Sequence, residues 1–505
     1  MQFFRYIFPL SLIMSLCLIL SAPPAGAVDF KVKGRWIFMA DYGKYGRFTD
    51  GGGSTGYNNR LGHDDFEMTS RMRVQLDAVA SEALSGTVQF EIGKFRWGQA
   101  STGGSMGADG VMVKVKHAYI DWMLPETDLK VRMGIQPVKL PSFTTDTQVL
   151  GADVAGVVLS YKVNEHLNPT LFWIRPYNDN YTGTGDDPRV SYQDNMDLFS
   201  LSVPLTFEGV KITPWAMLGM MGENTIRVKN NYFSGPVPIY YTRNLTALSM
   251  GMKNESLTGY GTLFWGGLTG EITRWDPFRI AWDFNYGSVR YDDESASRSG
   301  WLASLLLEYK FDWGIPGLYG WYSSGDDDST SNGSERMPYS DLDEVGYGSF
   351  SRYAFFGGRA SDDRNSRIGH SMAGTWGVGA RLNKISFLQD LTTDIRFNLI
   401  GGTNEPGLLK KLHDKTGIWM SPNNFSGENA TGMENLYLTT RDTAIEFGVT
   451  NNYKIYENLR LGFDFSYMKL FLDKSHDVWG NSRMNGKSDK VCDTWNFACF
   501  FGYSF

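Results

Sequence analysis

The residues at 494–505 constrain this chain more than any other feature of its sequence. Side chains on a β-strand alternate between two faces, so residues two positions apart share a face. One face of this stretch is aromatic or apolar, and the other is mostly small or polar, as at Asn496 and Ser504. The apolar face consists of Trp495, Phe497, Cys499, Phe501, Tyr503 and Phe505. Such a strand needs apolar surroundings on one side, either the core of a soluble β-protein or lipid.

Residues 1–27 predict a secretory signal peptide. They contain one basic residue, Arg5, an apolar run over 7–20, and the small residues Ala25-Gly26-Ala27. The apolar run is short for a helix that crosses a bilayer, and small residues follow it, as at a cleavage site. We therefore expect cleavage after Ala27 and an exported mature chain that starts at or near Val28.

The rest of the chain offers no transmembrane helix, because no apolar run after Leu20 is long enough. Glycine is frequent, at 57 residues, and aromatic residues make up 14% of the chain. A bilayer admits only helices or closed sheets, since every backbone N–H and C=O needs a partner inside the protein. The mean hydropathy of −0.29 fits alternating strands, whose two faces average out. If the chain spans a membrane, residues 28–505 therefore form one transmembrane antiparallel β-barrel.

Alternation recurs along the mature chain and predicts eighteen strands. Short turns such as Asp276-Pro277 fall at every second connection, and the other connections are long and polar, which is typical of transmembrane barrels. The pattern is poor over 222–256, and the alternation slips near His117, which suggests a β-bulge. Sixteen strands therefore remain an alternative. The predicted strands are 30–38, 66–80, 84–92, 111–124, 128–136, 154–162, 169–177, 196–207, 210–221, 257–273, 278–291, 299–311, 317–325, 371–387, 391–404, 441–456, 458–472 and 491–505.

Charged residues occupy the second face of many strands. In a packed soluble barrel they would be buried at high cost, whereas sixteen to eighteen strands enclose an aqueous lumen. In the first five strands basic residues dominate, and the acids are mainly Glu67, Asp77 and Glu91. We expect this basic set to give the lumen a weak preference for anions. Its members are Lys31, Lys33, Arg35, Arg71, Arg73, Lys114, Lys116, Lys130 and Arg132.

Other features argue against several functions. The formal net charge is −7, and loss of Arg5 makes it one unit more negative, which disfavours nucleic acid as a partner. Six scattered histidines lack zinc spacing, and the chain has no phosphate-binding loop or nucleophile motif, so we expect no cofactor. Cys492 and Cys499 would face opposite sides of one straight strand, which favours free thiols. Asp326-Asp327-Asp328 lacks the acidic twelfth residue of a calcium loop, so we interpret it as part of a solvated acidic loop.

The signal peptide, the alternation, the loop asymmetry and the terminal Phe505 together resemble the trimeric general porins of Gram-negative outer membranes, over the whole mature chain. The stretches 73–86 and 131–136 look most like the outer-membrane homotrimeric porins of sulfate-reducing, Desulfovibrio-type bacteria. The resemblance implies a homotrimer surrounded by outer-membrane lipid, through which small hydrophilic solutes and ions diffuse passively. It also implies that barrel-assembly machinery recognises the C-terminal strand through Phe501, Tyr503 and Phe505.

The same resemblance implies that the third long loop, which follows the fifth strand, folds into the lumen. The matching segment is 137–153, which is shorter than usual for such loops and holds few acids. Acids on this loop would face basic residues on the wall across a constriction. The predicted pore-lining and constriction residues are Arg71, Arg73, Lys114, Lys116, Lys130, Arg132, Lys139, Asp146 and Asp153.

The sequence leaves three alternatives to a general porin. A substrate-specific porin would need a binding track along the lumen, for which no continuous row of aromatic residues is apparent. An outer-membrane barrel enzyme would need a Ser or Asp/His set, and His63, His117, His370 and His476 are available but lie in no recognisable motif. An adhesin or structural barrel would be plugged by its long loops at 326–370 and 405–440. Conductance in a planar bilayer distinguishes these classes.

Overall fold

We describe the fold from a computed structural model of the chain. The structure describes residues 28–43, 65–107, 113–178, 195–223, 225–229, 232–234, 244–248, 257, 259–340, 372–417, 419–420, 437–481, 491 and 493–505. Residues 1–27, 341–371, His63 and Cys492 lie outside these ranges, and His370 is among the residues at 341–371.

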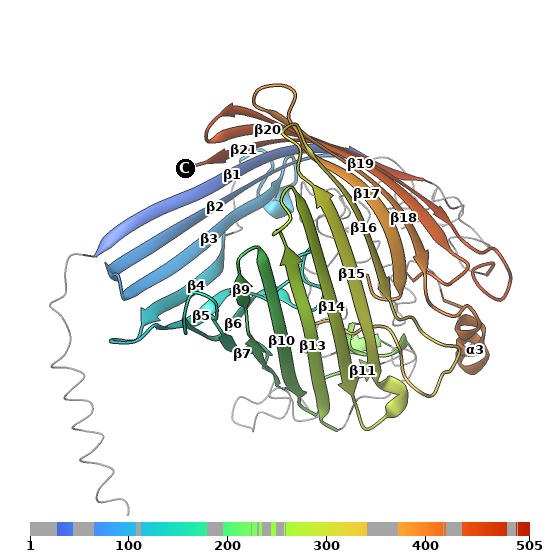
Figure 1. The fold of residues 1–505 in the computed structure, drawn as a ribbon. Coiled ribbons are helices and arrows are strands. Elements are labelled where there is room, and N and C mark those ends of the chain that lie inside the picture. Colours follow the sequence, from blue (N-terminus) through green and yellow to red (C-terminus); the bar gives the residue numbers. More distant parts are fainter. Residues whose placement is uncertain are drawn as a thin grey trace, which may run out of the picture.

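Eighteen antiparallel strands form one closed barrel in the described part of the chain (Figure 1). Each of the eighteen predicted strands overlaps one strand of the wall, so this prediction is confirmed and sixteen is ruled out. The prediction over 196–207 corresponds to two short segments, β8 and β9, which pair with β10 one after the other and count as one strand. The wall consists of β1 (Asp29–Gly43), β2 (Asp65–Ser81), β3 (Leu84–Arg96), β4 (Val113–Met123), β5 (Leu129–Lys139), β6 (Gly151–Tyr161), β7 (Thr170–Tyr177), β8 (Met196–Ser202) with β9 (Leu205–Phe207), β10 (Val210–Met221), β13 (Gly261–Ile272), β14 (Phe278–Arg290), β15 (Arg298–Tyr309), β16 (Ile315–Ser323), β17 (Thr375–Ile385), β18 (Leu391–Gly402), β19 (Thr443–Tyr456), β20 (Leu459–Phe471) and β21 (Thr494–Ser504).

The barrel closes where the first strand meets the last. β1 pairs with β21 from Arg35 opposite Ser504 to Gly43 opposite Asn496. Phe505 extends this closure, because its N–H donates to the carbonyl of Gly34 and its carbonyl accepts from the N–H of Gly34. Its ring stacks on Tyr503 and touches Trp36, while Phe501 is exposed on the same outer face. The C-terminal aromatic residues thus cover the outer side of the closing seam.

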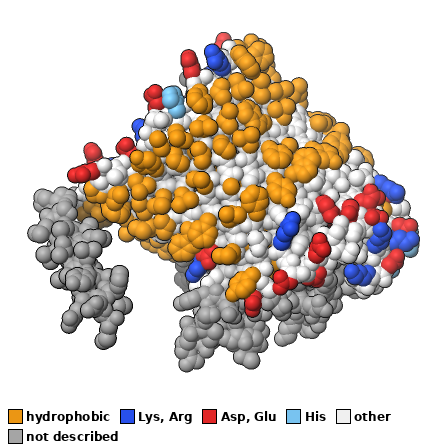
Figure 2. Space-filling model, turned by 60° about the horizontal axis from the view of Figure 1, so that its bottom comes forward, with side chains coloured by type: hydrophobic (Ala, Val, Ile, Leu, Met, Phe, Trp, Pro, Cys, Tyr) orange, Lys and Arg blue, Asp and Glu red, His pale blue; other side chains and the backbone are white. Residues whose placement is uncertain are grey.

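The outside of the barrel is apolar. Figure 2 shows a broad hydrophobic surface across the exterior, with acidic and basic side chains collected toward its borders. It consists of the exposed large residues at alternate positions of the strands, for example Phe278 and Phe284 on β14 and Leu305 on β15. Because the inward neighbours of these residues are polar or packed, the sheet has the two faces of a transmembrane barrel.

Connections alternate between short turns and long loops, and the structure has two ends that we name the turn end and the loop end. Among the described residues, the helices and the extra strands lie in the long connections. They are the short helices η1 (Ala100–Thr102) and η3 (Glu294–Ala296), the helix α3 (Gly407–Thr416) and the small hairpin of β11 (Arg227–Lys229) with β12 (Tyr232–Ser234). No helix in the described ranges is long and apolar enough to cross a membrane.

Regular pairing fails around the end of the hairpin made by β5 and β6. The predicted bulge near His117 is confirmed, since the β3–β4 register shifts between Gln89 and Phe90. The β4–β5 ladder ends at Ala118 opposite Ile135, and Pro137, which has no N–H to donate, follows two residues later. The β6–β7 ladder ends at Gly156 opposite Ile174. Residues 136–155, which we call the hairpin end, therefore lie beyond the ladders with β4 and β7.

Much of the loop end is filled by folded chain. Inward residues of β7, β8 and β10, such as Ile174, Leu198 and Met217, form a continuous apolar core with Leu140 and Val149 of the hairpin end. A smaller cluster joins α3 to the residues near Tyr437 and Trp479. The acidic loop that starts at Asp326 is part of this filling. Its interpretation as solvated is wrong for Asp326, which is buried and accepts hydrogen bonds from Ser334 Oγ and Tyr437 Oη.

Candidate functional site

The connection between β5 and β6 folds into the barrel, as predicted for the third long loop. Its two ends are tied together by the N–H of Leu140, which donates to the carbonyl of Leu150 at 2.9 Å. Leu140, Val149 and Leu150 are buried against the inner faces of β7–β10. Since these apolar residues leave water only by leaning on the inner wall, the hairpin end lies inside the barrel.

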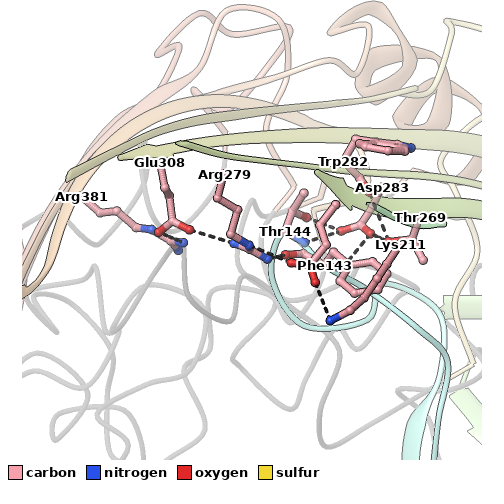
Figure 3. A network of polar contacts seen from close by, with 10 residues as sticks. Phe143, Thr144, Lys211, Thr269, Arg279, Trp282, Asp283, Glu308 and Arg381 are labelled. Atoms are coloured by element: carbon pink, nitrogen blue, oxygen red, sulfur yellow. Dashed lines mark hydrogen bonds and ion pairs between the residues drawn. The ribbon is translucent and has the colours of Figure 1, made fainter. Parts of the chain in front are cut away.

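A single carboxylate on the far wall holds the loop. Asp283 lies on β14 and accepts from the N–H groups of Phe143 and Thr144 at 3.0 Å each (Figure 3). It also accepts from Ser142 Oγ at 2.7 Å. The hydroxyl groups of Thr144 and Thr269 donate to it as well. Asp283 is the sixth of the thirteen residues of β14, so the loop is anchored near mid-height of the wall. A buried carboxylate surrounded by five donors is a strong and specific tether.

A second tether comes from Arg279, which lies four residues before Asp283 on β14 and on the same inward face. Its Nη2 donates to the carbonyl of Phe143 at 2.8 Å. The same guanidinium joins two carboxylates of the wall, Glu271 through Nε at 2.9 Å and Glu308 through Nη1 at 2.8 Å. These two ion pairs hold Arg279 in place independently of its contact with the loop.

These contacts belong to a chain of alternating charges on the inner wall (Figure 3). Lys211 Nζ lies 3.0 Å from Glu271 at one end, and Arg381 Nη2 lies 2.7 Å from Glu308 at the other. Arg381 and Glu308 belong to β17 and β15, and they meet across β16 at Gly317. A Cβ at Gly317 would lie 3.1 Å from Glu308 Cγ and 3.3 Å from Arg381 Cγ, so glycine leaves the space in which the pair forms.

The first five strands carry ion pairs in which some basic side chains, above all lysines, remain open to water. Arg73 Nε donates to Glu91 at 2.8 Å, and Arg132 binds Asp121 with two hydrogen bonds of 2.6 and 2.8 Å. Lys33 pairs with Asp77 and Lys130 with Asp121, but their side chains keep 62% and 41% of their area exposed. Arg381 and Glu308 keep only 5% and 10%. We call the inner side of β1–β5 the open face and that of β13–β17 the packed face.

Three arginines gather at the barrel seam, two of them on the open face and one on β20. Arg35 lies opposite Arg73 in the β1–β2 register. The Nη2 of Arg35 would be 3.6 Å from a Cβ on Gly502, and Gly502 is the register partner of Arg460 on β20. The guanidinium of Arg35 therefore lies over the strand that separates it from Arg460. Clustered positive charges raise the local potential, which favours anions.

The remaining predicted site residues lie around the hairpin end. Lys139, at the base of the loop, and Asp146, within the loop, form an ion pair of 3.0 Å. Asp153 lies on the face of the hairpin opposite to the buried Val154, and both Lys116 and His117 of β4 bind it. The other residues predicted there belong to the open face, where Lys114 lies opposite Glu91 in the register and Arg71 Nη1 lies 3.8 Å from Glu91. The predicted residues therefore divide between the open face and the hairpin end.

The anchor residues were not predicted as a site, although the sequence placed them on the inward face. Arg279 and Asp283 alternate with Phe278, Ile280 and Trp282, and this alternation gives their direction but not their partners. Of the residues considered for an enzyme, His117 binds Asp153 and His476 lies 3.4 Å from Asp477 in an exposed loop. Cys499 is a free thiol on β21, in agreement with the expectation for that residue.

No protein-family model matches the sequence, and no curated protein is detectably similar to it. Solved structures do share its fold. The crystal structure of OccAB2 from Acinetobacter baumannii aligns with a TM-score of 0.50 at 10% identity, over 94% of this chain and 98% of that one. The structure of OpdQ from Pseudomonas aeruginosa aligns with a TM-score of 0.49 at 9% identity, over 95% and 97%. The chain therefore has the fold of an outer-membrane porin barrel, closed by eighteen antiparallel strands.

Proposed function

We propose that this chain forms a water-filled channel in the outer membrane of a Gram-negative bacterium, through which small hydrophilic solutes and ions diffuse passively. The observation that carries the proposal is the unequal filling of the lumen. The loop at 140–150 is fastened to β13–β15, on the side away from β1–β4, while charged residues of the open face remain accessible. A path lined by water-accessible charges inside an apolar cylinder conducts ions.

The path is bordered by both signs of charge. Arg71, Arg73 and Arg132 lie on the open face, and Asp146 and Asp153 belong to the hairpin end. Low-dielectric walls strengthen the field of these groups on a passing ion. The hairpin end thus forms one side of a constriction, and the open face forms the other.

Reconstitution of the purified protein in a planar lipid bilayer tests this proposal. We expect steady, ohmic conductance steps that grow with salt concentration. Protein unfolded by heat before reconstitution is the control and should give none. Absence of steps from the folded protein would contradict a channel and favour an enzymatic or structural barrel.

A second candidate function is selective passage of anionic solutes. It is favoured by Arg35 and Arg460, for which the described residues provide no ion-pair partner, beside Arg73. A carboxylate or phosphate group that paused there would block the ion current for a time that depends on its concentration. Current recordings with a small dicarboxylate and with a diamine of similar length distinguish this candidate, since only the dicarboxylate should block. Equal effects of both solutes would favour the general channel.

Export and assembly complete the proposal. Residues 1–27 act as the signal peptide, and intact mass should show a mature chain that starts at or near Val28. Phe501, Tyr503 and Phe505 act as the recognition signal for barrel-assembly machinery and as the outer cover of the seam. Their joint replacement by serine should remove the protein from the outer-membrane fraction, and a normal amount there would refute this role.

The assembled state is a homotrimer, in keeping with the resemblance to trimeric porins of the Desulfovibrio type. Native mass spectrometry in mild detergent tests it by counting copies. Three copies would support the trimer, whereas one copy at all detergent concentrations would refute it.

A further inference from the structure

The hairpin end leaves the wall at a pair of glycines. Gly134 on β5 and Gly156 on β6 are register partners, and they stand where the ladders to β4 and β7 end. A Cβ on Gly134 would lie 2.2 Å from the carbonyl oxygen of Ala118, and one on Gly156 would lie 2.4 Å from that of Trp173. Gly134 also has a φ of 128°, which side chains other than hydrogen disfavour. Each glycine is therefore pressed against the backbone of the flanking strand at the point of departure.

Above this pair, the hairpin end has two different faces. Val138 and Val154 lie on one face and are buried in the apolar core that lines β7–β10. Asp153 lies on the other face and is exposed to the side of β4. The hairpin end thus leans toward β7–β10, and its polar face points toward β4.

A brace connects this polar face to β4. The bulge of β4 turns two consecutive side chains, Lys116 and His117, toward the carboxylate of Asp153. His117 Nε2 lies 2.8 Å from Asp153 Oδ1, and Lys116 Nζ binds the other oxygen. Both contacts pass from β4 to β6, although β5 lies between these strands in the sheet and its ladder with β4 ends at Ile135. The brace is the counterpart at the base of the tether that Asp283 provides at the tip.

We propose that the Gly134–Gly156 pair and the brace of Lys116 and His117 on Asp153 are the positioning residues that set how far residues 136–155 lean into the lumen, and so set the width of the channel. This inference rests on the proposed channel function. The glycines fix where the hairpin departs, the apolar core draws it toward β7–β10, and the brace holds its base back toward β4. Loss of the brace lets the hairpin lean further from β4 and widens the path along the open face.

Asp153→Asn tests the brace with least change of shape. Single-channel conductance is recorded in 1 M salt, where the Debye length is about 3 Å and charge effects are largely screened, so that width dominates the current. We expect a higher conductance and larger fluctuations of the open current than in the unmodified protein, and Asp153→Glu should restore steady current. Lys116→Gln should act in the same direction.

The matched control is Asp121→Asn. Asp121 also binds two basic residues, Lys130 and Arg132, but both lie on the neighbouring strand within the regular wall. We expect its conductance in 1 M salt to stay unchanged. Equal conductance and noise in Asp153→Asn, Lys116→Gln and the unmodified channel would overturn the inference, as would an equal rise in Asp121→Asn.

Gly156→Ala tests the departure point by a second route. The added methyl group meets the carbonyl of Trp173, so the hairpin should shift and the conductance in 1 M salt should change while the barrel stays resistant to detergent. If this variant does not assemble, the Asp153 variants still decide the matter. If the unmodified protein gives no conductance, the proposed function fails, and this result is distinct from a conducting protein that does not respond to loss of the brace.

Discussion

The open face and the packed face of the lumen carry the same kinds of side chain and differ in what covers them. Both have arginines in ion pairs with carboxylates at inward positions of antiparallel strands. The packed face is shielded by the infolded loop, whereas the open face meets the space that the loop leaves free. Alternation thus decides which residues point inward, and the infolded chain decides which of them meet water. The same charge should then govern permeation on one face and stability on the other.

Asp283→Ala should have the largest effect, because it breaks the cover that distinguishes the two faces. It leaves the loop N–H groups of Phe143 and Thr144 without their acceptor, at about 1–3 kcal/mol for each buried donor left unsatisfied. We expect the loop to come loose and the single-channel conductance to become higher and noisier. Asp77→Ala on the open face is the control, since Asp77 binds Lys33 and Thr87 but no part of the loop. A similar rise in both variants would show that the tether does not hold the loop.

Arg381→Gln should act on stability alone. It leaves Glu308 with one cationic partner, Arg279, in a largely buried site, so the loss should be smaller than the roughly 3–5 kcal/mol of a buried charge left with no partner. We expect the temperature at which the folded band disappears in detergent gels to fall clearly. The ion selectivity should not change, because Arg381 is shielded from the path. A shift in selectivity without loss of stability would mean that the packed face is open.

The reverse result is expected on the open face. Joint replacement of Arg71, Arg73 and Arg132 by Gln removes three positive charges from the open face. The reversal potential in a salt gradient should shift toward cations while the barrel stays folded. The shift should shrink as salt rises, because screening shortens the range of these charges. An unchanged reversal potential at low salt would place the selective region elsewhere.

The smallest effect concerns the cluster around α3, which fills part of the loop end. Asp442 is buried in a loop and accepts hydrogen bonds from Thr439 and Trp479 Nε1. Burial raises the pKa of Asp442 above its ordinary value, although these hydrogen bonds oppose the change. The folded cluster therefore binds this proton more tightly than the unfolded chain does. Its stability is highest below the unfolded pKa of about 3.9 and decreases as the pH rises through the raised pKa.

Protection of the loops against protease, followed from pH 3 to pH 7, measures this effect. Asp473 works in the opposite sense, because hydrogen bonds from Ser475 and the charge of Arg441 outweigh partial burial and lower its pKa. Its contribution is present above the unfolded pKa and is lost as the pH falls. In Asp442→Asn the contribution of Asp442 is absent and that of Asp473 remains. The protection of this variant should therefore only decrease as the pH falls. An identical pH profile in the variant and the unmodified protein would exclude a role for Asp442.

The wall of the barrel could be predicted from the sequence because each strand states its own two faces. Phe278, Ile280 and Trp282 identify the outer side of β14 without knowledge of any neighbour. The bulge near His117 was predictable for the same reason, since it interrupts a local period. The infolded third loop followed from the resemblance to porins.

The contacts of the loop could not be predicted, because they depend on register and distance. Phe143 and Asp283 are 140 positions apart in the sequence. Basic residues were predicted to dominate the early strands, with Glu67, Asp77 and Glu91 as the main acids, but which of them pair was not predictable. Arg73 faces Glu91 and Arg132 faces Asp121 once the strands are in register. The interpretation of Asp326 as solvated failed likewise, because its partner Tyr437 lies in another loop. The pattern of one strand predicts which way its side chains point, whereas their partners on other strands follow only from the register of the closed sheet.

The charge chain on the packed face also protects the alignment of the strands. It runs from Lys211 on β10 through β13, β14 and β15 to Arg381 on β17, with Gly317 leaving a gap in β16 that the last pair crosses. A slip of one residue in any of these strands would send its charged member to the lipid side, where a basic side chain costs up to about 2–4 kcal/mol. A slip of β14 would also take the acceptor away from the loop. The chain of charges therefore favours the correct register, because a misaligned strand loses its ion pairs while the sheet forms.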